Sequence, residues 1–122
     1  MKARTFTHAQ KQGLNRAAAY YLEQCYKRKT AARVAEFAAL LARNPEYLTR
    51  TTSSMTGVTL LEFLRAKQVE EAERLLTTTP LSVADIALHA GFGTPSTLYR
   101  CFKQLHGMPP GHFREVRKCE KN

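Results

Sequence analysis

The sequence predicts an all-α protein, and three observations support that prediction. Apolar residues recur every three or four positions along almost the whole chain, as they do on amphipathic helices. No stretch alternates polar and apolar residues for long enough to form a sheet. Glycine, proline and threonine clusters separate the periodic segments by short connections. Together these features predict seven helices in a chain of 122 residues, about the length of one domain.

Three of the seven helices are predicted within residues 10–57. The first spans residues 10–27 and would bury Leu14, Ala18 and Leu22. Thr30 is the expected N-cap of the second, because its hydroxyl could accept a hydrogen bond from an amide of the first turn. The second helix would bury Val34, Phe37, Ala38 and Leu41. Pro45 suits the first turn of a third helix, which Gly57 would end.

The longest helix is expected from Leu60 to Leu76. Thr59 is its expected N-cap, and Glu62 stands three residues later, which is the spacing of a capping box. At about 1.5 Å per residue this helix would be roughly 25 Å long. Its expected core-facing side consists of Leu61, Leu64, Ala72 and Leu75.

The last three helices follow in residues 80–118. Ser82 is the expected N-cap of a short helix that ends at Gly91-Phe92-Gly93. The sixth helix begins at Thr94 or Pro95 and runs to His106, and residues 112–118 form a short final helix. Gly91 can adopt positive φ and reverse the chain, so that Phe92 can fill the space between two helices. A short helix, a glycine-containing turn and an amphipathic helix together predict a helix-turn-helix.

The sixth helix has two different sides. At about 100° per residue, one side is expected to face the core and consists of Leu98, Cys101, Phe102 and Leu105. Ser96, Arg100 and Lys103 fall on the opposite side. Arginine can bond to both acceptors of guanine, serine can bond to bases or phosphates, and lysine can neutralise a phosphate. The polar side therefore suits a DNA major groove, although a solvated helix face has the same composition.

The chain is basic, with a net charge of +9. Residues 1–50 carry a net charge of +7, residues 51–85 one of −2, and residues 86–122 one of +4. Two basic ends around a weakly acidic middle favour a polyanionic partner.

Other function classes have little support in the sequence. The three cysteines are far apart, which indicates neither a disulfide framework nor a metal site, and the dispersed histidines have no partners at ligand or catalytic spacing. No motif for a cofactor and no catalytic residue is predicted. No apolar stretch is long enough for a membrane span or a secretory signal, so we expect a cytoplasmic protein.

The segment LSVADIALHAGFGTPSTLYRCFKQLHGMPPGHFR resembles the DNA-binding domain of AraC/XylS-type bacterial transcription regulators. The residues that match this family are Ile86-Ala87, Gly91-Phe92, Ser96, Arg100, Phe102-Lys103, Gly107, Pro110 and Phe113-Arg114. The segment FLRAKQVEEAERLL resembles the family's connecting helix, and NPEYLTR the start of its first recognition helix. The similarity extends over residues 14–118.

The resemblance implies one DNA-binding domain over residues 1–122. It would contain a first helix-turn-helix subdomain (10–57), a connecting helix (60–76) and a second helix-turn-helix subdomain (80–118). The two recognition helices would enter adjacent major grooves, about 34 Å apart. The same resemblance implies sequence-specific binding of double-stranded promoter DNA and transcriptional activation through RNA polymerase. We expect the protein to bind DNA as a monomer.

Some residues depart from the family pattern. Thr52 stands where the family usually has a buried phenylalanine, so the first unit is expected to be less firmly packed. Gln68 replaces an arginine of the connecting helix. The residues expected to contact DNA are Glu46, Thr49 and Arg50 in the first unit and Pro95, Ser96, Thr97, Arg100 and Lys103 in the second.

A second hypothesis keeps the fold but not the DNA recognition. In that hypothesis the weakened first unit binds a protein partner and regulates it. Sequence preference in DNA binding distinguishes the two hypotheses, because an interaction module would show none.

Overall fold

The computed structural model describes residues 8–41, 53 and 57–121. In these residues the chain is all-helical and contains no strand, as the sequence predicts. The six helices are α1 (His8–Arg28), α2 (Val34–Leu40), α4 (Leu60–Thr78), α5 (Val83–His89), α6 (Pro95–His106) and α7 (Pro110–Lys121). The sequence predicted seven helices. The additional one, expected between Pro45 and Gly57, lies outside the described residues except for Ser53 and Gly57.

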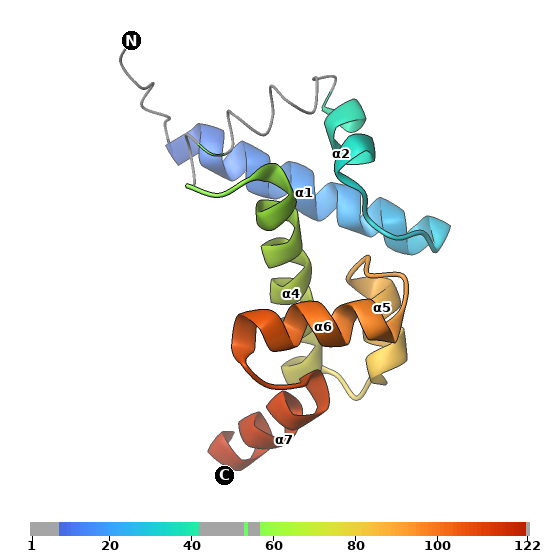
Figure 1. Cartoon of the computed structure of the whole chain (residues 1–122), viewed down its shortest axis with the longest axis vertical. Coiled ribbons are helices and arrows are strands. Elements are labelled where there is room, and N and C mark those ends of the chain that lie inside the picture. The colour runs from blue at the N-terminus through green and yellow to red at the C-terminus, as the bar shows by residue number, and fades with distance from the viewer. Residues whose placement is uncertain (1–7, 42–52, 54–56, 122) are drawn as a thin grey trace.

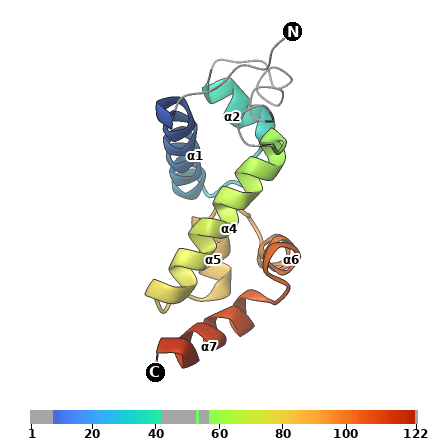
Figure 2. The same cartoon turned by 90° about the vertical axis from the view of Figure 1, so that its left-hand side faces the viewer.

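The long helix α4 runs through the molecule and has packed helices at both of its ends (Figure 1). Helices α1 and α2 lie at its N-terminal half, and α5, α6 and α7 gather around its C-terminal half. Seen from the side, α1 and α6 lie on opposite sides of α4 (Figure 2). The buried residues form two clusters, one built from α1, α2 and the start of α4, the other from the rest of α4 with α5, α6 and α7.

Helix α4 uses a different face for each cluster. Leu60, Phe63 and Leu64 contribute to the first cluster, whereas Val69, Ala72, Leu75 and Leu76 contribute to the second. At about 100° per residue the centres of these two groups lie roughly 140° apart around the helix. The prediction that Leu61 faces the core was wrong, since its side chain is 49% exposed. Leu61 lies on the side that the second cluster covers, but in the first turn of α4, where that cluster does not reach.

The start of α4 has the predicted cap. The Thr59 hydroxyl accepts a hydrogen bond from the Glu62 amide at 3.1 Å, and the Glu62 carboxylate accepts one from the Thr59 amide at 3.0 Å. These reciprocal bonds satisfy two amides at the helix start that have no partner within the helix. The same bonds lower the pKa of the Glu62 carboxyl, the bond from the Thr59 backbone being the largest cause.

The expected role of Thr30 was wrong. Helix α1 ends at Arg28, Lys29 adopts a left-handed conformation with φ of 56°, and the Thr30 amide bonds back to the Cys25 carbonyl at 3.0 Å. Thr30 therefore closes α1 and does not begin α2. The N-cap of α2 is Arg33, which makes no side-chain capping bond.

No helix among the described residues is both long and apolar enough to cross a membrane.

Candidate nucleic-acid interface

Helix α5, a tight turn and α6 form the predicted helix-turn-helix. Ser82 caps α5 by accepting a hydrogen bond from the Asp85 amide at 3.1 Å. At the other end, the Phe92 amide bonds to the Ala87 carbonyl at 2.9 Å and the Gly91 amide to the Leu88 carbonyl at 3.2 Å. This pair of bonds is a Schellman motif, which requires the positive φ of 77° at Gly91.

Helix α6 is capped at both ends. The Thr94 hydroxyl accepts a hydrogen bond from the Thr97 amide at 3.3 Å, and Pro95 occupies the first turn, where its missing N–H costs nothing. Gly107 ends the helix with φ of 76° and donates its amide to the Lys103 carbonyl at 2.7 Å. These local features fix the length of α6 without any help from a ligand.

One side of α6 is seated in the second cluster. Leu98 and Phe102 are fully buried, and Cys101 is half-buried against the same cluster. The ring of Phe102 meets that of Phe113 edge-on, with centroids 5.1 Å apart. These contacts determine which side of α6 is turned outward.

The prediction that Leu105 faces the core was wrong, because its side chain is 57% exposed. In the last turn of α6, His106 and not Leu105 faces the core. Its ring stacks on Phe102 at 4.4 Å and lies 5.0 Å from Phe113, and its Nε2 is 3.3 Å from a carboxylate oxygen of Glu73 on α4. The aromatic environment and the carboxylate partner hold His106 inward, so the neighbouring Leu105 is turned to solvent.

The outward side of α6 carries the residues that the sequence predicted for the second unit. Pro95, Ser96, Arg100 and Lys103 are exposed. Thr97 is half-buried, and its hydroxyl lies 3.1 Å from that of Thr94. The four exposed side chains are not covered by another described part of the chain. The residues predicted for the first unit, Glu46, Thr49 and Arg50, lie outside the described residues.

The two cations on this side are not compensated by acids. Neither Arg100 nor Lys103 forms an ion pair within the part of the chain that the structure describes. The Lys103 ammonium lies 5.9 Å from the centroid of the exposed Tyr99 ring, a cation–π geometry that leaves the charge facing solvent. The outward side of α6 therefore presents net positive charge.

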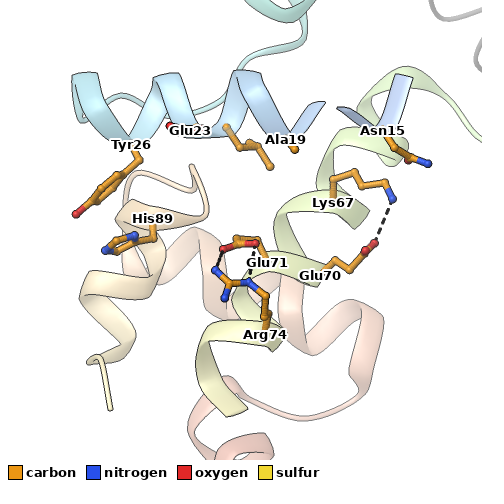
Figure 3. A pocket seen from close by; sticks show the side chains of 10 residues that line it. Asn15, Ala19, Glu23, Tyr26, Lys67, Glu70, Glu71, Arg74 and His89 are labelled. Atoms are coloured by element: carbon orange, nitrogen blue, oxygen red, sulfur yellow. Dashed lines mark hydrogen bonds and ion pairs between the residues drawn. The ribbon is translucent and has the colours of Figure 1, made fainter. Parts of the chain in front are cut away.

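A groove of about 550 Å³ between α1, α4 and α5 differs from the outward side of α6 because its cations are paired with acids. Figure 3 shows Lys67 and Arg74 directed at Glu70 and Glu71, with which they form ion pairs. Glu71 raises the pKa of the Arg74 guanidinium through a hydrogen bond and its charge. The charges of this groove compensate one another, and Glu23 adds a further carboxylate, so the groove is a poor surface for a polyanion.

Arg114 has a structural role that the sequence did not reveal. Its Nε donates to the Leu76 carbonyl at 3.0 Å and its Nη2 to the Thr79 carbonyl at 3.1 Å. Carbonyls at the end of a helix have no partner within the helix, and Arg114 of α7 provides donors for the end of α4. A signal was present in the sequence, because α4 ends in a threonine run without the glycine that commonly closes a helix.

Comparisons with known proteins agree with this geometry. Residues 37–116 match the family of helix-turn-helix domains. The HTH-type transcriptional regulator YisR of Bacillus subtilis is 30% identical over 99 residues, which is 81% of this chain and 34% of that protein. The melibiose operon regulatory protein of Escherichia coli is 30% identical over 73 residues, 60% of this chain and 24% of that protein. The chain thus spans about a third or less of the length of these relatives.

Solved structures show the same fold. The DNA-binding domain of AdpA, a global transcriptional factor solved in complex with a target DNA, superposes with a TM-score of 0.73 at 28% identity, covering 88% of this chain and 94% of that one. The C-terminal domain of AraT, a response regulator from Geobacillus stearothermophilus, gives a TM-score of 0.70 at 26% identity, covering 85% of each chain.

Proposed function

The chain belongs to the AraC-type helix-turn-helix family of DNA-binding transcription regulators, and on that premise we propose that it binds promoter DNA sequence-specifically through the outward side of α6. The observation that carries the proposal is the exposure of two cations, Arg100 and Lys103, on a helix whose other side is fixed in the core. Neither cation forms an ion pair with the residues that the structure describes. The complex of AdpA with a target DNA supports it.

Each residue on α6 has a role suited to its chemistry. Arg100, at the centre of the outward side, bonds to O6 and N7 of a guanine in the major groove. Lys103 neutralises a phosphate, and Ser96 bonds to a base edge or a phosphate. Pro95 and Thr97 lie at the N-terminus of α6, which approaches the DNA first. The bond between the Thr94 and Thr97 hydroxyls holds that end in place.

We also propose that the chain reads two adjacent major grooves. The first unit, residues 10–57, would contact the neighbouring groove through Glu46, Thr49 and Arg50, and the second, residues 80–118, through α6. The helix of residues 60–76 would hold the two units about 34 Å apart, one turn of DNA. The net charge of +7 in residues 1–50 supports a DNA contact by the first unit.

The consequence of DNA binding is proposed to be activation of transcription in a bacterial cytoplasm. In this proposal the chain binds its operator as a monomer and contacts RNA polymerase. No enzymatic activity is assigned to it, because the family is defined by a DNA-binding domain.

Selection of bound sites from random duplexes tests the proposal. We expect enrichment of a consensus with a guanine at the position of Arg100. Mobility shifts on the selected site should resist excess competitor DNA. If about six phosphates are neutralised, log K plotted against log[salt] should have a slope near −5.

The same experiment addresses the alternative hypothesis. A protein-interaction module would enrich no consensus and would be displaced from any duplex by competitor. That result would contradict the proposed function, whatever the affinity for bulk DNA.

A further inference from the structure

The turn between α5 and α6 contacts the first cluster directly. The Ala32 amide, in the connection between α1 and α2, donates a hydrogen bond to the Gly91 carbonyl at 2.8 Å. The two connections meet beside the C-terminal end of α1 (Figure 1). A residue of the first unit is therefore bonded to the backbone of the second, independently of α4.

The two glycines of this turn make the contact possible. A Cβ added at Gly91 would lie 3.1 Å from Leu22 Cδ2 and 3.4 Å from Ala32 Cβ. A Cβ added at Gly93 would lie 3.0 Å from Ala31 Cβ. The contacts at 3.0 and 3.1 Å are tighter than those that real Cβ atoms usually make, so a side chain at either position would require its neighbours to shift by a few tenths of an ångström. Both glycines also have positive φ, of 77° and 81°.

Gln68 of α4 completes the junction. It is fully buried, and it is the one buried polar side chain among the residues whose burial the structure describes. Its Nε2 donates to the Ala90 carbonyl at 3.1 Å, and its Oε1 accepts from the Arg65 guanidinium at 3.0 Å. The Ala90 and Gly91 carbonyls are thus bonded to α4 and to the first unit, respectively.

We propose that Gln68 and Gly91 are positioning residues that fix the orientation of α6 relative to α1 and α2. A single helix between two units can bend and twist, whereas a second connection closes a ring and removes that freedom. A fixed orientation would allow the protein only one spacing between the two parts of its DNA site. This consequence rests on the proposed function. Neither residue contacts the DNA.

The orientation can be measured without DNA. Residual dipolar couplings of the wild-type protein should fit one alignment tensor for α1, α2, α5, α6 and α7. Gln68→Leu keeps a buried side chain of similar size but loses the bond to Ala90, and Gly91→Ala introduces the close contacts. In both variants we expect two different tensors, one for each unit. Two tensors in the wild type, or one unchanged tensor in both variants, would overturn the proposal.

Spacing of the DNA site gives the functional measurement. One base pair inserted between the two parts of a selected site shifts them by about 3.4 Å and rotates them by roughly 35°. For the wild type we expect affinity to fall about tenfold or more, and for Gln68→Leu by less than about threefold, because a loosened junction can follow the displaced half-site. Leu75→Val, which weakens the second cluster away from the junction, is the matched control and should keep the wild-type spacing dependence.

The outcomes separate this inference from the proposed function. A wild type that selects no consensus contradicts the proposed function, and the alignment experiment then still decides whether the junction is rigid. A wild type that binds its consensus but tolerates the insertion overturns the positioning role. Equal spacing dependence in the wild type and Gln68→Leu overturns it as well.

Discussion

The hydroxyl of Tyr21, in the middle of α1, accepts a hydrogen bond from the backbone amide of Arg33 at the start of α2, at 2.8 Å. The same hydroxyl lies 2.7 Å from Oε1 of Glu36, to which it donates. Arg33, the N-cap of α2, makes no side-chain capping bond. Its backbone amide instead finds a hydrogen-bond acceptor in a tyrosine twelve residues earlier in the chain. Burial is the largest cause of the raised pKa of this hydroxyl, which stays protonated and able to donate.

Tyr21→Phe should therefore destabilise the protein. The substitution leaves the Arg33 amide without its acceptor and Glu36 without its donor, and we expect the free energy of unfolding to fall by about 1–2 kcal/mol. Urea unfolding followed by circular dichroism measures the change. Tyr20→Phe is the control, because Tyr20 is 53% exposed, and it should change stability by less than about 0.5 kcal/mol. Equal effects of the two substitutions would contradict the capping role.

Lys29→Gly should stabilise the protein. Lys29 closes α1 in the left-handed region, with φ of 56°, where a side chain is strained and glycine is not. After allowing for the greater freedom of glycine in the unfolded chain, we expect a gain of about 0.5–1 kcal/mol in thermal unfolding. Lys27→Gly, within α1, should lower stability by about the same amount. A loss of stability in Lys29→Gly would show that the side chain makes a favourable contact that outweighs the strain.

Arg100→Ala should weaken binding to the selected operator. We expect a loss on the order of 1–3 kcal/mol and relaxed preference at one base position, measured by mobility shift on the consensus and on its point variants. Arg74→Ala removes the same charge from the groove beside α1. Arg74 is already paired with Glu71 and is not among the proposed DNA contacts, so Arg74→Ala should change affinity by less than about threefold. Unchanged affinity in Arg100→Ala would show that Arg100 does not contact the operator.

The capping box of α4 should make stability depend on pH. The folded-state pKa of Glu62 is lowered from 4.5, so its ionised form stabilises the protein above pH 4.5, and that stabilisation is lost as pH falls through the folded pKa. The stability difference between the wild type and Glu62→Ala should be constant near neutral pH and shrink below pH 4.5. The difference between Glu62→Gln and Glu62→Ala should stay constant, because the amide accepts the bond from Thr59 without ionising. If the stability difference between the wild type and Glu62→Ala stayed constant below pH 4.5, the lowered pKa of Glu62 would be contradicted.

Much of the fold could be predicted because it depends on neighbouring residues. The capping box of Thr59 and Glu62, the cap at Ser82 and the glycine turn after α5 are interactions between groups a few positions apart, so the residue types and their spacing are sufficient. The same holds for the outward side of α6, since Leu98 and Phe102 define its buried side by helical periodicity alone.

Only the tertiary structure decided which helices pack against one another and which side of each helix makes the contact. Periodicity places residues around a helix but does not say where along its length a partner covers them, which is why Leu61 and Leu105 were wrongly assigned to the core. Gln68, Arg114 and Tyr21 act on backbone groups 22, 38 and 12 positions away, respectively. Such bonds form only once packing has brought those groups together, and no local pattern in the chain records that proximity.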